Sequence, residues 1–221
     1  MIKVENINVS GIEAAVRGMR NPLNSWDKAD STFNEETHEF AVGPNDFDLM
    51  KRLYKAGTEH RKYLRMIHVS MDITAPLYWW KEYDTYKVGT VANSCSTMHK
   101  IASKEFIFAD FSTEHLTRPS LDCLSNTIDI LNDARKWYLK YDSMSDEDKK
   151  HFDTNITCKK DLWWQMIQLL PTSYNQKRTV DFNYENVFTF IRQRSGHKLD
   201  EWNAFVDILK NLPAVRGLME E

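Results

Sequence analysis

The segment RMIHVSMDITAP, residues 65–76, constrains the fold of this chain more than any other. Every second side chain from Ile67 to Ile73 is apolar, and the side chains between them are polar. Because successive side chains of a strand point to opposite faces, this alternation predicts a strand with one face on a hydrophobic core. Proline is favoured in the first turn of a helix, so Pro76 predicts that the following LYWWKEYDTY is helical. We expect its Trp79 and Trp80 to pack in a core or an interface.

The remaining periodicities alternate between strand and helix. Further strands are expected over residues 2–10, as an edge strand, and over residues 173–182. Helices are expected over residues 11–20, 46–57, 119–142, 161–170, 183–194 and 199–212. Polar, turn-rich loops are expected over residues 21–40 and 87–100. The chain shows neither repeats nor an interdomain linker, so residues 1–221 are predicted to form a single α+β domain.

Composition excludes several classes of function. The net charge is -3, so there is no basic field to attract nucleic acid. No apolar run approaches the ~20 residues that a membrane span needs. Three cysteines at irregular spacing, without a secretory leader pattern, favour a reducing, cytoplasmic setting and predict no metal site. We therefore expect a cytoplasmic protein that binds neither nucleic acid nor membrane.

The loop KVGTVANSCSTMHK, residues 87–100, has the densest cluster of small polar residues. Backbone amides and hydroxyls at this density suit a phosphate or a pyrimidine, with Lys87 or Lys100 as the counter-charge. The alternative is a Ser/Thr-rich turn that satisfies its own backbone. Cys95 is expected to be a small buried thiol rather than a nucleophile. Glycine-rich dinucleotide motifs and P-loops are absent from the sequence, so a nucleotide would need a site built from scattered loops.

Two blocks of sequence resemble the flavin-dependent thymidylate synthases. The first, residues 60–100, places His60, a strand, Ala-Pro opening a helix and the polar loop in the order found in that family. The second is LLPTSYNQKRTVDFNYENVFTFIRQR, residues 169–194. It matches the family's Leu-Pro, strand, helix-starting Asn and F-L-x-L-R motif, with Pro171, Asn183 and Arg194 at the family's intervals.

The signature R-H-R-x-x-S-x-N-x-x-S-x-R of this family is degenerate here. If Asn93 and Ser96 occupy its N-x-x-S positions, Met98 replaces the final arginine and Tyr86-Lys87-Val88 replaces R-H-R. An alignment without a gap from Pro76 leaves only Lys87 on an arginine position and places Glu82 on the preceding glutamine.

Two further arginine positions of the family are occupied by Ile167 and Glu185. Losing one partner of a buried arginine–phosphate pair typically costs ~2–5 kcal/mol, so other cations would have to replace the lost ones. The candidates are Arg17, Arg20, Arg61, Lys62, Arg65, Lys87 and Lys100.

The resemblance implies a central, mostly antiparallel sheet flanked by helices and a specific activity. Members of the family methylate carbon 5 of dUMP, with methylenetetrahydrofolate as carbon donor, FAD as cofactor and NADPH as reductant, in a homotetramer. The carried-over flavin-binding residues are His60, Lys87, Asn93 and Asn183. The carried-over nucleotide-binding residues are Glu82, Ser94, Ser96 and Arg194, with Ser96 and Arg194 as catalytic residues.

The missing arginines leave two alternatives open. One is the same fold acting on a different or modified pyrimidine nucleotide, and the other is a non-catalytic relative that binds a nucleotide or a partner without FAD. Asn183 and Arg194 lie about three helical turns apart and are expected to face one ligand. The alternative for this pair is a helix-capping asparagine and a surface arginine.

Overall fold

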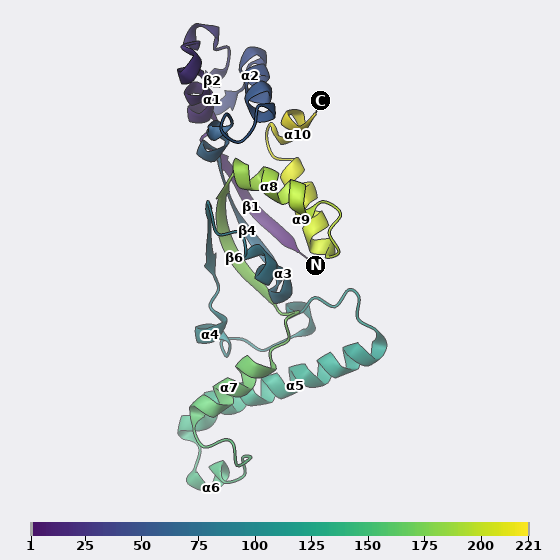
Figure 1. Ribbon diagram of the computed structural model, residues 1–221. Coiled ribbons are helices and arrows are strands. Elements are labelled where there is room, and N and C mark those ends of the chain that lie inside the picture. Colours follow the sequence, from purple (N-terminus) through teal and green to yellow (C-terminus); the bar gives the residue numbers. More distant parts are fainter. Residues whose placement is uncertain (1, 221) are drawn as a thin grey trace. The chain divides into compact units, whose positions relative to one another are not determined.

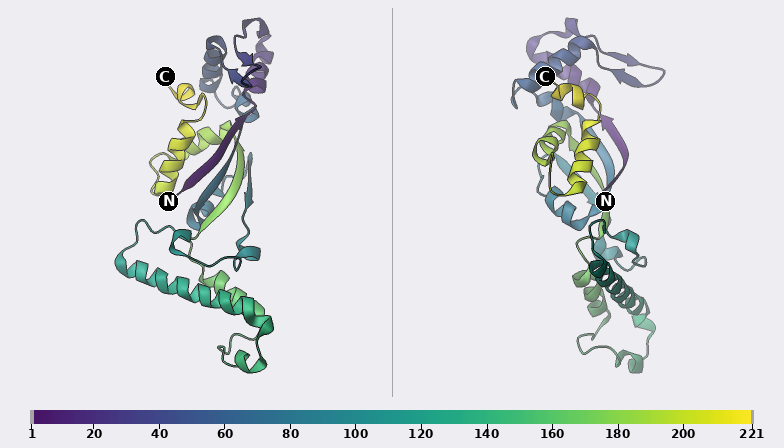
Figure 2. Two further views of the ribbon diagram at one scale, coloured as in Figure 1. Left: turned by 180° about the vertical axis from the view of Figure 1, so that it is seen from behind. Right: turned by 90° about the vertical axis from the view of Figure 1, so that its right-hand side faces the viewer.

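The computed structural model describes residues 2–220 as a mixture of strands and helices. Four strands form the main sheet in the order β1-β4-β6-β5: β1 (Lys3–Ser10), β4 (His68–Pro76), β6 (Asn175–Asn183) and β5 (Thr90–Ser94). The sheet is antiparallel and flanked by helices (Figure 1, Figure 2). The prediction of an α+β fold with a central, mostly antiparallel sheet is confirmed.

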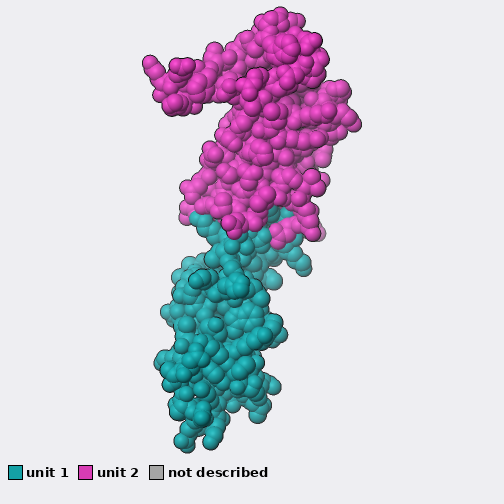
Figure 3. Space-filling view, turned by 90° about the vertical axis from the view of Figure 1, so that its left-hand side faces the viewer, with its two compact units in different colours: residues 1, 74–83, 94–178 teal, residues 2–73, 84–93, 179–221 magenta. Residues whose placement is uncertain are grey.

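The described chain divides into two compact units, coloured separately in Figure 3. Unit 1 contains Thr74–Tyr83 and Ser94–Arg178. Unit 2 contains Ile2–Ile73, Asp84–Asn93 and the chain from Thr179 onward. Strands β4 and β6 each contribute residues to both units. That the whole chain behaves as one domain stays a prediction.

Strand β4 distributes its side chains as the alternating pattern predicted. Every second side chain from Val69 to Ile73 is buried. On the opposite face, Asp72 accepts a hydrogen bond from Thr179 Oγ1 of β6 at 2.6 Å and another from Asn6 Nδ2 of β1 at 3.0 Å. Polar side chains thus connect three strands on one face, and the apolar face is left for packing against helices.

Unit 2 adds several helices and 3-10 turns to its part of the sheet. These are α1 (Ile12–Arg20), α2 (Pro44–Lys55), α8 (Tyr184–Arg194), α9 (Asp200–Lys210) and α10 (Val215–Met219), with the 3-10 turns η1 (Asn21–Leu23), η2 (Trp26–Lys28) and η3 (Lys62–Met66). Helices α8 and α9 run along the sheet in both figures (Figure 1, Figure 2). Phe190 of α8, Phe205 of α9 and Phe182 of β6 form an aromatic core with ring centroids 5.4–6.3 Å apart.

A buried ion pair organises the N-terminal part of unit 2. Arg20, at the end of α1, donates from Nε to Asp46 Oδ1 of α2 at 2.5 Å, and both side chains are almost fully buried. Asp46 also accepts hydrogen bonds from the Ser31 hydroxyl at 2.6 Å and from the Ser31 and Asp30 amides. Asp46 therefore fixes residues 30 and 31 against α2, and Arg20 also donates to the carbonyls of Ser25 and Lys28.

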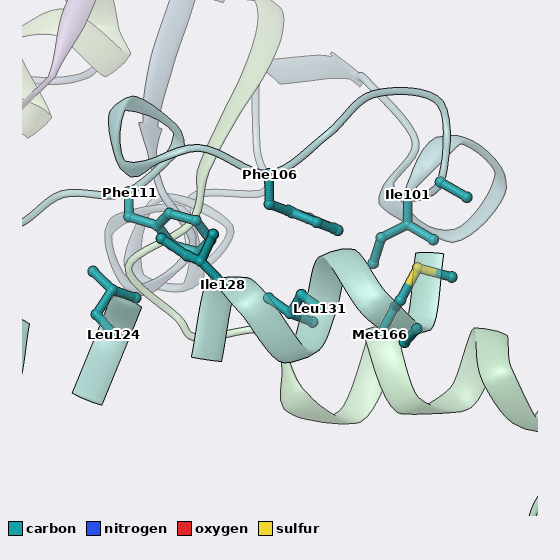
Figure 4. Close-up of a cluster of buried hydrophobic side chains, with 9 residues drawn as sticks. Ile101, Phe106, Phe111, Leu124, Ile128, Leu131 and Met166 are labelled. Atoms are coloured by element: carbon teal, nitrogen blue, oxygen red, sulfur yellow. The ribbon is translucent and has the colours of Figure 1, made fainter. Parts of the chain in front are cut away.

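The regular structure of unit 1 is mainly helical, together with the residues of β4 and β6 that belong to this unit. Its helices are α3 (Leu77–Tyr83), α4 (Thr97–Lys100), α5 (Arg118–Lys140), α6 (Asp146–Lys149) and α7 (Lys159–Leu169), with the turns η4 (Phe108–Asp110) and η5 (Tyr141–Ser143). Figure 4 shows its core, a cluster that contains Leu124, Ile128 and Leu131 of α5 and Met166 of α7. Throughout residues 2–220, no helix is long and apolar enough to cross a membrane.

Two segments predicted as loops contain regular structure. Residues 87–100 contain β5 and α4, and residues 21–40 contain most of a hairpin of β2 (Thr32–Asn34) and β3 (Glu39–Ala41), in which Phe33 pairs with Phe40. Most side chains of β2, β3 and β5 are exposed. Strands without a buried face lack the alternation of apolar and polar side chains by which a strand is predicted. Their backbone hydrogen bonds do not depend on side-chain identity, so the sequence does not indicate them.

Candidate functional site

The N-terminus of α8 is the centre of the candidate site in unit 2. Asn183 caps this helix, since its side chain accepts a hydrogen bond from the Asn186 amide at 3.2 Å. Asn186 returns the contact with its Oδ1 and donates from Nδ2 to the carbonyl of Val88 at 2.8 Å. The reciprocal cap therefore also holds the loop that precedes β5.

Gly89 allows that loop to approach the helix. Its φ is +73°, in the left-handed region that favours glycine. A Cβ atom at this position would lie 2.7 Å from Asn183 Nδ2 and 2.8 Å from Asn186 Oδ1. The loop and the two amide side chains are thus fitted to each other without room for a further carbon.

A cavity of about 370 Å³ opens beside this contact. It is lined by Arg65, Thr85, Tyr86, Lys87, Val88, Asn183, Glu185, Asn186 and Thr189, all of which belong to unit 2. Lys87 and Arg65 are exposed at its wall, so two cations face the same space. Of the seven cations considered as replacements for the missing arginines, these two line the cavity.

Glu185, which stands at an arginine position of the resembled family, is the one acidic residue among the lining residues. Arg61 donates from Nη2 to Glu185 Oε1 at 2.9 Å, and both side chains are largely buried. An opposite charge at this distance compensates the carboxylate. The cavity therefore keeps a positive balance in spite of the substitution.

Arg194, at the C-terminal end of α8, is held by aromatic neighbours. Its Nε donates to the Tyr86 hydroxyl at 2.7 Å, and its guanidinium lies 4.6 Å from the Trp202 ring centroid and 5.3 Å from that of Tyr86. Nη1 lies 3.1 Å from His197 Nε2. Tyr86 lines the cavity and Arg194 does not. Arg194 therefore contacts the site only indirectly, by its hydrogen bond to Tyr86.

His60 lies apart from Lys87 and Asn183 in unit 2. It is exposed and lines a different cavity of about 440 Å³, whose other walls include Met19, Leu53 and Met66. Asn93 is exposed on β5. The structure thus gathers Lys87 and Asn183 in one cavity and leaves His60 and Asn93 outside it.

The remaining predicted site residues belong to unit 1. Ser96 caps α4, accepting a hydrogen bond from the His99 amide at 3.1 Å. Ser94 is exposed at the end of β5, and Glu82 is half-buried on α3. Cys95 is exposed, so its expected burial is wrong. Its backbone is hydrogen-bonded instead: the amide donates to the Lys177 carbonyl at 3.0 Å, and the carbonyl accepts from Gln176 Nε2 at 2.8 Å.

Sequence reasoning did not single out Asn186 and Thr189 as site residues. The signal for Asn186 was available, because an amide three residues after a capping Asn183 completes a reciprocal cap. Thr189 lies three residues after Asn186, less than one turn further along α8, where only the packing of the helix decides which side chains face a cavity. In the described part of the chain, no group of three or more His, Cys, Asp or Glu side chains is placed to hold a metal ion.

No family model matches this sequence. No curated protein matches it either. Solved structures do match. One is thymidylate synthase X (ThyX) of Helicobacter pylori with FAD and dUMP, at 15% identity and a TM-score of 0.65, over 100% of this chain and 98% of that chain.

Another similar structure is the UMP/dUMP methylase PolB of Streptomyces cacaoi bound with 5-Br dUMP. It is 12% identical with a TM-score of 0.60, over 99% of this chain and 94% of that chain. The similarity covers nearly the full length of both chains, which a shared fold explains and a shared local motif does not. The chain has the fold of the flavin-dependent thymidylate synthases.

Proposed function

We propose that this protein binds FAD and a uracil nucleotide and methylates carbon 5 of dUMP, with methylenetetrahydrofolate as carbon donor and NADPH as reductant. Support comes from the fold, which is that of enzymes solved with FAD and dUMP and with a dUMP analogue. Fold alone does not define a substrate, so the proposal rests on the cavity at the start of α8.

The observation that carries the proposal is the charge balance of that cavity. Lys87 and Arg65 line it, and its one acidic lining residue, Glu185, is neutralised by Arg61. Arginine and lysine at a helix N-terminus are a common phosphate-binding arrangement. The residues present therefore fit a phosphate group of a nucleotide cofactor, in spite of the degenerate signature.

The roles of the chain's own residues follow from these contacts. Lys87 and Arg65 would hold a phosphate, while Asn183 and Asn186 fix the loop that presents Lys87. Tyr86, held by Arg194, would close the wall behind Lys87. Bound FAD, once reduced, would supply the hydride for the methylation.

The other residues carried over from the resembled family complete the proposal. Ser96 is proposed to contact the nucleotide as a catalytic residue with Arg194, and Ser94 and Glu82 to bind substrate. His60 and Asn93 are proposed to contact flavin in the assembled enzyme. We also propose a homotetramer and a cytoplasmic location, where three exposed free thiols stay reduced.

Arg194 favours a second candidate function. Its guanidinium is already engaged by Tyr86, His197 and Trp202. A residue held in this way offers less to a dianionic phosphate, which favours a different or modified pyrimidine nucleotide, or a non-catalytic nucleotide- or partner-binding role without FAD.

The first experiment is the visible absorption spectrum of the protein as purified, and again after incubation with FAD and desalting. Retained flavin bands are expected. The flavin-loaded protein is then assayed for dTMP formation from dUMP with methylenetetrahydrofolate and NADPH. A protein that stays colourless after both treatments would contradict FAD binding and leave the non-catalytic alternative.

The matched variants are Lys87→Gln and Lys150→Gln. Lys87→Gln should weaken FAD retention by about tenfold or more, because it removes one of two cations from the cavity. Lys150 is exposed in unit 1, so Lys150→Gln should leave retention unchanged. Equal retention by the two variants would contradict this placement of the phosphate.

A further inference from the structure

A second cavity of unit 2 is lined by residues further along α8. Its volume is about 400 Å³, within the range of small-molecule sites. It is lined by Tyr54, Arg61, Phe188, Thr189, Ile191, Arg192, Ser195 and Met219, and shares only Thr189 with the cavity described above. Four elements or their connections build it: the end of α2, the segment before η3, helix α8 with the residue after it, and α10.

The walls of this cavity are apolar and aromatic. Phe188 and Ile191 are buried side chains of α8. The Tyr54 ring packs against the Phe188 ring with centroids 4.5 Å apart, and Met219 of α10 is partly exposed at the rim. A flat ring would bury its faces against such side chains.

Two guanidinium groups bring positive charge to these walls. Arg192 is exposed, and its side chain makes no hydrogen bond or ion pair with other residues of the described chain. Arg61 lies 5.4 Å from the Tyr54 ring centroid and donates from Nη2 to Glu185, while its Nε is buried without a hydrogen-bond partner among residues 2–220. With Glu185 set against Arg61, one positive charge remains.

The other polar groups do not oppose an anion. Burial raises the pKa of Tyr54, so this phenol is neutral at physiological pH. Thr189 and Ser195 donate their hydroxyl protons to backbone carbonyls, at 2.9 and 2.6 Å. The donors left for a ligand are therefore those of Arg61 and Arg192 and the neutral Tyr54 hydroxyl. Two guanidinium groups, one of them already paired with Glu185, suit the single charge of a carboxylate better than a dianionic phosphate.

We propose that this cavity binds a small aromatic monocarboxylate, with the carboxylate on Arg192 and Arg61 and the ring against Tyr54, Phe188 and Ile191. The proposal does not depend on the nucleotide site. The two cavities are nevertheless connected, because Arg61 lines one and its partner Glu185 lines the other. A carboxylate that draws Arg61 away would expose the charge of Glu185 to an anion in the first cavity.

The test is calorimetric titration of the full chain with benzoate, with benzyl alcohol as the neutral probe and acetate as the probe without a ring. Benzoate should bind saturably and at least about tenfold more tightly than either probe. Binding of benzyl alcohol as tight as that of benzoate would overturn the role of the arginines, and the absence of saturable benzoate binding would overturn the site.

Variants locate the binding. Arg192→Gln should weaken benzoate about tenfold, and Ser195→Phe, at an exposed position after α8, should block the cavity without disturbing the core. Arg17→Gln, an exposed arginine of α1 paired with Glu13, is the control and should bind as the wild type. Unchanged affinity in both cavity variants would contradict the proposal. Lys87→Gln separates the two sites, since it should impair FAD retention and leave benzoate binding intact.

Discussion

Two arginines of α8, two residues apart, have opposite environments. Arg194 lies over Trp202 and Tyr86 and donates to the Tyr86 hydroxyl, whereas Arg192 is exposed. The sequence motif FIRQR presents both as equivalent cations. At the scale of the residue, the difference comes from the aromatic side chains that α9 and the loop before β5 bring to one side of the helix.

We expect Arg194→Ala to lower the free energy of unfolding by about 2 kcal/mol, because it removes two cation–π contacts and a hydrogen bond. Arg192→Ala is the matched control and should change it by less than about 0.5 kcal/mol. Urea denaturation followed by circular dichroism measures both. Equal losses would mean that the aromatic contacts of Arg194 add nothing.

Asp46 makes the stability of unit 2 depend on pH. Burial raises the pKa of Asp46, but hydrogen bonds from Ser31, Arg20 and Asp30 outweigh it and hold the pKa below its ordinary value. A carboxyl whose pKa is lower in the folded state stabilises the fold above its unfolded pKa of about 3.9. That contribution is lost as the pH falls through the lower, folded pKa.

Asp46→Asn should therefore cost about 3–5 kcal/mol at neutral pH, since it leaves the buried Arg20 charge uncompensated. The wild type should lose stability on acidification below about pH 4, and the gap between it and the variant should narrow. Urea denaturation at neutral pH and at about pH 3 measures this. Asp48→Asn, at an exposed position of the same helix, should match the wild type, and a constant gap at both pH values would refute the linkage.

At the scale of the element, the loop before β5 depends on one glycine. Gly89 has a φ of +73°, and Gly196 after α8 has a φ of +70°. A Cβ atom added at Gly196 would meet no other atom of the described chain within 4 Å. The two positions share the same backbone strain on substitution and differ only in their neighbours. Alanine at Gly196 therefore measures the free-energy cost of the left-handed backbone alone, and alanine at Gly89 measures that cost plus the cost of the steric clash.

We expect Gly196→Ala to cost about 1–2 kcal/mol, the usual penalty of a left-handed backbone for an alanine. Gly89→Ala should cost more, because its Cβ would also displace the Asn183 and Asn186 side chains. Hydrogen–deuterium exchange should show faster exchange over residues 84–89 in Gly89→Ala alone. Equal costs and unchanged exchange would mean that the loop does not depend on this contact.

At the scale of the whole molecule, β4 and β6 belong to both compact units. A strand that continues from one unit into the other couples them through the chain, because unfolding of either unit frees part of the strand. This favours one cooperative transition, as the prediction of a single domain requires.

Leu131→Ala tests that prediction from the core of unit 1. The side chain is fully buried in α5, and its truncation should cost about 2–5 kcal/mol. If the chain is one cooperative domain, amide protection in α9 of unit 2 falls by the same amount as in α5. Leu139→Ala, exposed on the same helix, should change neither. Loss of protection confined to unit 1 would show two domains.

Local patterns in the sequence were enough for most of the fold. The alternation from Ile67 to Ile73 predicted β4, and Trp79 and Trp80 are buried as expected. The helix predicted after Pro76 begins at Leu77 and ends at Tyr83, three residues earlier than expected. The cap at Asn183 was also readable, because it joins residues three apart. Strands β2, β3 and β5 escaped prediction since they bury no continuous face.

The sequence by itself determined strands β1, β4 and β6 and the longer helices, the α+β class and the resemblance that solved structures bear out at the level of the fold. Only the tertiary structure decided that Arg61 compensates Glu185, that Gly89 meets Asn183, and that Arg194 is held by Tyr86 and Trp202. Local preferences act between neighbours in the chain. These contacts join residues that are distant in the sequence and are brought together only by packing. The periodicity of apolar residues therefore does not predict them.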